Sequence, residues 1–198
     1  MIQKETHPWK WYVPANSRIL IIGTFPPLKE KWSYHFFYPN KQNLFWPVMS
    51  RLVNQELKYL SGEAAVEERK QILELLKAGI TDMGFEIERK ANSSLDENLI
   101  VIEYMDIFKI LKENVFISKI IFTSSSGTVS ASKWFVNYLS IKNMNLKFPK
   151  GSKPLKSEFQ FEERVIQLVI LYSPSRRAAN RISFEKLVEM YANEIVLY

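Results

Sequence analysis

Short apolar segments rich in β-branched residues lie between breakers along the chain, and this pattern predicts buried strands. Four segments have this character: residues 19–23, 80–87, 117–123 and 165–172. The second is the least regular of the four, because Asp82 and Gly84 interrupt it. Between these segments apolar residues return every three or four positions, which is the spacing of a helix with one buried face.

This spacing predicts four helices. Their apolar positions are Phe45, Val48, Met49 and Leu52; Ala65, Ile72, Leu73 and Leu76; Ala131, Phe135, Tyr138 and Leu139; and Phe184, Leu187, Val188 and Tyr191. Ser183 directly precedes the last helix and is expected to cap it. Strands that alternate with helices predict an α/β fold in which helices cover both faces of a parallel sheet.

Composition excludes several classes of protein. The chain has 198 residues, which fits a single domain spanning residues 1–198. The absence of cysteine excludes disulfides, cysteine nucleophiles and cysteine-ligated metals, and two histidines, His7 and His35, do not favour a histidine metal site. Neither a lysine-bearing phosphate loop nor a serine-hydrolase elbow occurs, and no dinucleotide fingerprint follows Gly23. We therefore expect no metal and no organic cofactor.

Charge and hydropathy bear on partners and location. The 27 Lys+Arg against 21 Asp+Glu give a net charge of +6, which suits a polyanionic partner, although many basic proteins bind none. The amino-terminal segment lacks the apolar core of a secretory signal. The longest apolar runs are far shorter than the ~20 residues that span a bilayer. We expect a cytoplasmic protein, nucleoid-associated if bacterial, with no membrane partner.

Ligands of parallel α/β sheets bind beyond the carboxyl ends of the strands, so the loops that follow the strands form the candidate site. The first of these loops begins at Gly23 and enters a stretch rich in aromatic residues: Trp32, Tyr34, Phe36, Phe37 and Tyr38. Such rings either pack under the edge of the sheet as a satellite core, a small cluster beside the main core, or form a platform for a nucleic-acid base. Stacking on an aromatic ring stabilises each bound base by ~1–3 kcal/mol. Two asparagines, Asn40 and Asn43, allow two interpretations. Their amides either read a base edge or hold a water in a binding site, or they serve only as turn or helix-cap residues.

Three further loops carry polar or basic residues. Ser173-Pro174-Ser175-Arg176-Arg177 either grips a phosphate through hydroxyls, amides and charge or forms a solvated turn. Ser124-Ser125-Ser126-Gly127 either cradles a phosphate or caps the next helix. Residues 142–156 hold five lysines and no acid, and either contact a nucleic-acid backbone or form a solvated connection.

Taken together, these loops resemble the uracil-DNA glycosylase superfamily, and most closely its mismatch-specific uracil/thymine and hypoxanthine-DNA glycosylase branches. Gly23-Thr24-Phe25-Pro26 is similar to the G-x-x-P of the first loop. Phe36, Pro39 and Asn43-Leu44-Phe45-Trp46 resemble the aromatic residue, the proline and the N-x-F-W that follow it. Two middle elements of the superfamily are similar to residues 78–82 and to Ser94-Leu95-Asp96. Its last strand, second loop and final helix are similar to residues 168–191. The resemblance spans about residues 17 to 195.

The resemblance implies a three-layer α/β/α sandwich with a central, mainly parallel four-stranded sheet. It also implies a monofunctional DNA glycosylase of base-excision repair, which flips a deaminated base of the uracil or hypoxanthine type out of the helix and hydrolyses its N-glycosidic bond. The partner would then be DNA that contains a damaged or mismatched base. A monomer is expected, because a wedge loop must reach a long duplex.

The resemblance also implies roles for single residues. Asn43 matches the asparagine that positions the attacking water in hypoxanthine-type relatives, and Asn40 is its alternative because two extra residues follow Pro39. Phe36 is expected to stack on the base. The base would also contact the first loop, namely Gly23, Thr24, Phe25 and Pro26. The second loop, namely Ser173, Pro174, Ser175, Arg176 and Arg177, would contact the DNA, with one of the arginines in place of an apolar wedge.

The chain departs from the resemblance at Phe25, where mismatch-type relatives carry a water-positioning asparagine. This departure leaves open a catalytically silent nucleic-acid-binding relative with the same fold. The serine-rich loops leave open a hydrolase of nucleosides or nucleotides. Asp82, at the end of the second apolar segment, either faces the pocket or has a buried structural role.

Overall fold

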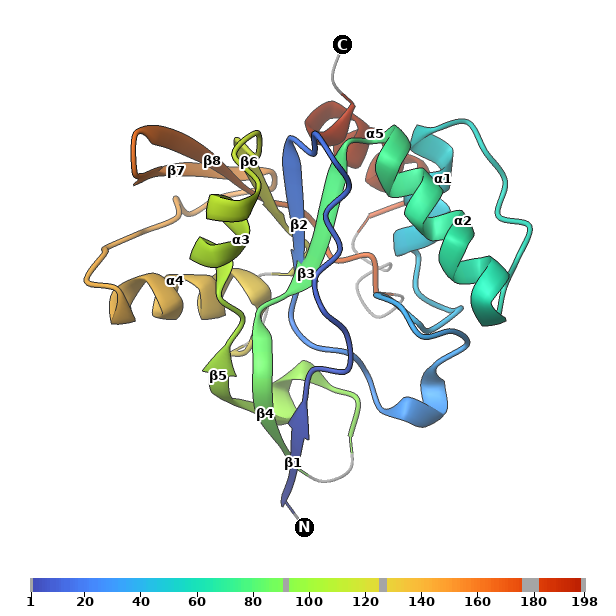
Figure 1. Cartoon of the computed structure of the whole chain (residues 1–198), viewed down its shortest axis with the longest axis horizontal. Coiled ribbons are helices and arrows are strands. Elements are labelled where there is room, and N and C mark those ends of the chain that lie inside the picture. The colour runs from blue at the N-terminus through green and yellow to red at the C-terminus, as the bar shows by residue number, and fades with distance from the viewer. Residues whose placement is uncertain (1, 91–92, 125–127, 176–181, 197–198) are drawn as a thin grey trace.

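Residues 78–90 form two strands that belong to different β-sheets, so the single strand predicted over residues 80–87 is wrong. The computed structural model describes residues 2–90, 93–124, 128–175 and 182–196. β3 (Ala78–Asp82) lies in a central sheet, and β4 (Gly84–Lys90) lies in a smaller sheet beyond its carboxyl end (Figure 1). Met83 separates them: its amide donates to the carbonyl of Gly23 (2.9 Å), and its carbonyl accepts from the amide of Met105 (2.8 Å).

In the described part of the chain, the central sheet has five strands in the order β3-β2-β6-β8-β7. β2 (Ile19–Gly23), β6 (Lys119–Phe122) and β8 (Arg164–Ile170) are parallel to β3, which confirms the predicted mainly parallel sheet. The predicted number of four strands is one too low, because β7 (Leu155–Phe161) also pairs, antiparallel, with β8 at the edge. Its apolar residues alternate with polar ones, as in an edge strand with one face on the core.

The smaller sheet is antiparallel and orders β1 (Ile2–Thr6), β4 and β5 (Leu99–Tyr104). Neither β1 nor β5 is predicted from the sequence. This sheet projects from the carboxyl end of β3 and carries the amino terminus of the chain (Figure 1). It therefore lies on the side of the central sheet at which the candidate site is expected.

Helices cover both faces of the central sheet. α1 (Phe45–Leu52), α2 (Gly62–Leu75) and α5 (Phe184–Ile195) lie on one face, and α3 (Ile107–Glu113) and α4 (Ala131–Ile141) on the other (Figure 1). The four predicted helices are thus confirmed, and so is the Ser183 cap, whose hydroxyl accepts from the amide of Lys186 at 3.3 Å. α3 is not predicted from the sequence, because a helix of seven residues shows little periodicity.

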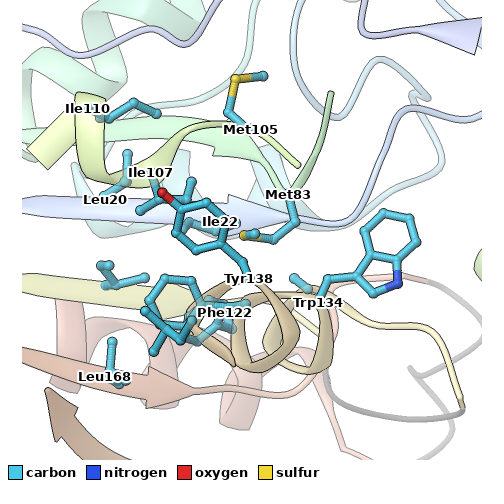
Figure 2. Packing of buried hydrophobic residues seen from close by; sticks show 14 of the residues in the cluster. Leu20, Ile22, Met83, Met105, Ile107, Ile110, Phe122, Trp134, Tyr138 and Leu168 are labelled. Carbon is cyan, nitrogen blue, oxygen red and sulfur yellow. The ribbon is translucent and has the colours of Figure 1, made fainter. Parts of the chain in front are cut away.

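Alternate residues of β2 divide between two cores, as the pleat of a strand requires. Ile19 and Ile21 pack toward α1, α2 and α5, whereas Leu20 and Ile22 pack toward α3 and α4. Figure 2 shows the second of these cores, in which the side chains of Leu20, Ile22, Phe122 and Leu168 pack with those of the covering helices. The fold is the predicted α/β sandwich of three layers.

The rings of the aromatic loop belong largely to the core on the α1 face. Tyr34, Phe36 and Phe37 are at most 5% exposed and pack with the buried residues of α1 and α2. The satellite-core alternative from the sequence therefore holds for these three rings. None of the helices in the described ranges has the length and apolar character needed to span a bilayer.

Candidate active site

The parallel strands end at one edge of the central sheet, where hydroxyl and carboxyl groups gather. Gly23 and Asp82 are paired across β2 and β3, and Thr123 follows β6 in the same layer. The hydroxyl of Thr24 lies 3.1 Å from that of Ser124. Thr24 directly follows β2 and Ser124 lies two residues after β6, so this contact joins the loops of two neighbouring parallel strands at the edge where such folds bind ligands.

Gly23 has no room for a side chain. A Cβ atom there would collide with Oδ1 of Asp82 and lie 3.1 Å from the hydroxyl of Tyr38. The carboxylate of Asp82 is therefore held directly against the backbone at the start of the first loop. Asp82 thus faces the candidate site, which the sequence left open.

His7 holds the other oxygen of this carboxylate. Its Nε2 lies 3.1 Å from Oδ2 of Asp82, and its Nδ1 lies 2.7 Å from the carbonyl oxygen of Trp9. The side chain of His7 is fully buried and that of Asp82 is 9% exposed. Rings of Phe37 and Phe25 flank the imidazole at 5.6 and 5.4 Å. Sequence reasoning missed His7, because 75 positions separate it from Asp82 and no local pattern marks it.

The side chain of Phe25 is buried in the core on the α3 and α4 face of the sheet. It is 8% exposed, its ring meets the imidazole of His7 edge-on, and a Cβ on Gly84 would lie 3.0 Å from it. The first loop can therefore contact a ligand at this position only through its backbone. The carbonyl of Pro26 is already used, because it accepts from the guanidinium of Arg89 at 2.9 Å.

The two candidate asparagines hold local turns. Oδ1 of Asn43 accepts from the amide of Phe45 (2.9 Å) at the start of α1, and Oδ1 of Asn40 accepts from the amide of Gln42 (2.9 Å). The capping alternative is thus realised for Asn43. Both residues are half-buried, and within the described ranges the amide nitrogen of Asn43 donates to no protein atom. That nitrogen remains available to a water or a ligand.

Tyr38, rather than Phe36, carries its ring to the strand ends. The hydroxyl of Tyr38 lies 2.6 Å from Oγ1 of Thr123, and its ring stacks on Phe45 at 3.9 Å. Burial and then the Asp82 carboxylate raise the pKa of Tyr38 well above its ordinary value, so its hydroxyl keeps its proton. Phe36 instead stacks on Trp46 in the core, so its predicted stacking on a base stays a prediction.

Residues 93–96 are fastened to the first loop by Arg89, which is 1% exposed. The guanidinium of Arg89 binds both carboxylate oxygens of Glu5 at 2.7 and 3.0 Å and donates to the carbonyls of Ser93 (3.0 Å) and Pro26 (2.9 Å). The amide of Leu28 donates to the hydroxyl of Ser94 at 3.2 Å. The segment similar to the middle motif of the superfamily is therefore part of the site.

Asp96 belongs to this fastened segment, and Thr24, Asp82 and Arg89 lie close enough to act on the pKa of its carboxyl group. Burial, and then the charge of Asp82, raise the pKa of Asp96 to about 6, against the opposing effects of Thr24 and Arg89. A shifted carboxyl group at the strand ends makes Asp96 a candidate residue of the site.

The second loop meets the first at Pro174, whose carbonyl accepts from the amide of Leu44 at 2.9 Å. The hydroxyl of Ser173 accepts from the amide of Ser175 (3.2 Å), which closes a tight polar turn. Arg176 and Arg177 lie outside the described residues. The contact between Leu44 and Pro174 brings the two predicted loops together, with Asn43 next to the second loop.

The two remaining polar loops differ in their relation to the site. The hydroxyl of Ser124 accepts from the amide of Ala131 (2.9 Å) at the start of α4, and residues 125–127 lie outside the described residues. The basic loop of residues 142–156 runs into β7, which begins at Leu155, and Nζ of Lys153 lies 4.9 Å from the centre of the Tyr172 ring. This contact places the end of the basic loop beside the second loop.

The fold and its strand-end loops define an α/β sandwich with a cluster of polar groups at the carboxyl edge of its parallel strands. The chain is similar to a solution NMR structure from Methanosarcina acetivorans that is described as a "putative Uracil DNA glycosylase". The TM-score is 0.60, the sequence identity is 16%, and the likeness covers 98% of each chain. No protein-family model matches the chain, and neither does any curated protein. The likeness shows a shared fold over the whole length.

Proposed function

We propose that the chain is a monofunctional DNA glycosylase of base-excision repair. It flips a deaminated base, of the uracil or hypoxanthine type, out of DNA and hydrolyses its N-glycosidic bond. The observation that carries the proposal is the junction of the two loops, where the amide of Leu44 donates to the carbonyl of Pro174 beside the strand ends. The fold shared with the Methanosarcina protein and the net charge of +6 support the same function.

The roles follow from the position of each group. The amide nitrogen of Asn43 is free to hold the attacking water, with Asn40 as its alternative one turn earlier. The backbone from Gly23 to Pro26 contacts the base, and Phe36 or the nearby Tyr38 supports it. Ser173, Pro174 and Ser175 grip the DNA backbone, and Arg176 or Arg177 fills the gap that the flipped base leaves. The protein acts as a monomer.

Hydrolysis requires no covalent bond to the enzyme. A placed water, stabilisation of the positively charged sugar and hydrogen bonds to the departing base are sufficient, and placement alone accounts for a large part of such a barrier. Flipping costs a few kcal/mol and costs least at a mismatched pair, which favours deaminated bases over normal ones.

The test is base release from duplexes that carry uracil, hypoxanthine, xanthine or a G·T mismatch. We expect release from the uracil or hypoxanthine duplex, with strand breaks only after alkali or heat. Asn43→Ala should abolish release while the fold and DNA binding survive, and Asn40→Ala is its matched control. If Asn40→Ala alone abolishes release, the water belongs to Asn40. Strand cleavage without alkali or heat would contradict a monofunctional enzyme.

A second function, that of a silent nucleic-acid-binding protein, is favoured by the inward position of Phe25. With that side chain in the core, the first loop offers no side-chain amide at the position where mismatch-type relatives carry one. DNA binding by the purified protein without release from any duplex would establish this second function. Turnover of a free nucleotide without DNA would instead identify a nucleotide hydrolase.

A further inference from the structure

Two consecutive carbonyl groups of the first loop are each held by a side chain. The carbonyl of Pro26 accepts from the guanidinium of Arg89 at 2.9 Å, and the carbonyl of Pro27 accepts from Nε1 of Trp32 at 2.8 Å. Proline has no amide hydrogen, so its carbonyl is the backbone group through which a hydrogen bond can hold it. Arg89 and Trp32 therefore fix the path of the loop where the segment proposed to contact the base ends.

The amino-terminal part of the chain holds both of these side chains in turn. We call residues 5–12 the amino-terminal strap. The carboxylate of Glu5 binds the guanidinium of Arg89 at 2.7 and 3.0 Å. The ring of Trp9 packs against the ring of Trp32, with their centres 4.9 Å apart, a separation at which aromatic pairs attract each other. The strap thus supports both side chains that grip the first loop.

The amino-terminal strap is itself anchored on either side of Trp9. The amide of His7 donates to the carbonyl of Phe85 at 2.7 Å. Tyr12 exchanges two backbone hydrogen bonds with Ile80 of β3, at 3.0 and 2.8 Å, where the strap has left β1 and runs beside β3 (Figure 1). The backbone that carries Trp9 is therefore tied to both sheets, and its ring is presented to Trp32 from a fixed position.

This arrangement bears directly on the proposed reaction. The side chain of Phe25 is buried, so the first loop contacts a ligand there only through its backbone. The place of that backbone matters, because a displacement of ~1 Å can lower a rate ~100-fold. Resting on the function proposed above, we propose that Trp9 and Trp32 are positioning residues of the reaction. Trp9 holds the ring of Trp32, whose N–H group holds the carbonyl of Pro27 and with it the backbone that meets the base.

The burial of the two rings makes the proposal testable without loss of the fold. Trp9 and Trp32 are both half-buried. Replacing a half-buried ring with a smaller side chain leaves a depression at the surface instead of a closed cavity, which costs less stability than truncation in a core. The effect of such variants should therefore be seen in the rate of reaction rather than in the thermal unfolding transition.

Trp11 offers a matched control in the same strap. It is half-buried like Trp9, but its ring lies beside the ammonium groups of Lys10 and Lys109, at 5.1 and 5.7 Å. Within the described ranges it makes no hydrogen bond or ring contact with the first loop. Trp11→Phe should therefore leave the reaction unchanged.

The test is single-turnover base release from the uracil and hypoxanthine duplexes. Trp32→Phe keeps a ring against Trp9 but removes the N–H group, and we expect its rate constant to fall between ~10- and ~100-fold. Trp9→Leu should lower the rate constant in the same range, and Trp9→Phe, which keeps a ring, should recover most of it. The amplitude of release and the affinity for DNA should not change, because a merely structural defect would reduce the amount of active protein instead.

Hydrogen–deuterium exchange reports on the loop itself. The amide of Leu28 directly follows the two prolines and donates to the hydroxyl of Ser94 at 3.2 Å. In Trp32→Phe and Trp9→Leu, peptides that cover residues 23–28 should exchange faster than in wild type, whereas Trp11→Phe should match wild type. Unchanged exchange in both variants overturns the proposal. If Trp9→Leu does not fold, Trp32→Phe carries the test.

The outcomes for the two tryptophans and for the proposed function are distinct. Wild-type rate constants in Trp32→Phe and Trp9→Leu overturn the positioning role and leave the glycosylase intact, and so does a loss of amplitude at an unchanged rate constant. No release by wild type from any duplex overturns the glycosylase, and the role of the tryptophans in its reaction with it. A lower rate constant together with faster exchange, full amplitude and an unaffected Trp11→Phe supports both.

Discussion

The carboxylate of Asp82 occupies the space beside Gly23 in which any other residue would place its Cβ atom. The two residues are paired across adjacent parallel strands, at the edge where the first loop begins. Glycine is therefore required here for close approach rather than for backbone freedom. The pairing brings a carboxylate from one strand to the backbone of the next, and the site is built around it.

Gly23→Ala should disrupt this pairing. The added methyl group collides with the Asp82 carboxylate, and overpacking of a closed site lowers the free energy of unfolding by about 1 to 3 kcal/mol. Base release should be lost as well, because the first loop must shift. Urea denaturation measures the first effect. The double variant Gly23→Ala/Asp82→Ala should be more stable than the sum of the single effects, and strict additivity would contradict the collision.

His7→Ala should destabilise the protein, whereas His35→Ala should not. Loss of the His7 ring leaves the Asp82 carboxylate without its partner and opens a cavity beside Phe37 and Phe25. We expect the free energy of unfolding to fall by about 2 to 4 kcal/mol. His35 is exposed, so its substitution should change stability by less than about 0.5 kcal/mol. Equal effects of the two substitutions in thermal unfolding would contradict this role of His7.

Arg89→Lys should loosen the first loop although it keeps the positive charge. A lysine cannot reproduce the bidentate contact with Glu5 together with the bonds to the carbonyls of Ser93 and Pro26. We expect a loss of about 2 to 4 kcal/mol in the free energy of unfolding, because buried polar groups lose their partners. Base release should fall with it. Lys90→Ala, at the exposed neighbour, is the control, and an unchanged unfolding midpoint for Arg89→Lys would refute the prediction.

The basic loop should contribute to DNA affinity in a salt-dependent manner. Lys147 and Lys150 are exposed, and the contact of Lys153 with Tyr172 holds the end of this loop beside the second loop. In Lys147→Ala/Lys150→Ala, the slope of log affinity against log salt should become shallower by about 0.9 for each DNA phosphate that is no longer neutralised. Arg18→Ala removes an exposed charge just before β2, at the opposite end of the central sheet, and should leave the slope unchanged. Fluorescence anisotropy with labelled duplex measures both.

Local pattern was sufficient for much of the fold. The structure contains β2 where the apolar run of residues 19–23 predicted a strand. It also contains α1, α4 and α5 where helical spacing begins at Phe45, Ala131 and Phe184, and Ser183 caps α5 as predicted. These features depend on neighbours a few residues apart, so the sequence displays them directly. β7 was missed because an edge strand with alternating polarity has the weakest signal of this kind.

Some features of the candidate site could be predicted from local sequence, and others depended on the tertiary structure. The loops after the strands could be named from the sequence, because parallel strands present their carboxyl ends at one edge. The tertiary structure alone decided which side chains lie at this edge. Phe25 is buried in the core, the hydroxyl of Tyr38 reaches Thr123 at the strand ends while Phe36 lies in the core, and Arg89 fastens Ser93 to the first loop.

The sequence by itself determined β2, β6 and β8, the helices α1, α2, α4 and α5, and the edge of the sheet at which a ligand would bind, since periodicity and capping are local properties. The division of residues 78–90 between different sheets and the pairing of His7 with Asp82 were decided only by the tertiary structure. Both depend on packing between segments far apart in the chain. The energy of such contacts comes from burial and geometry that no short stretch of residues encodes.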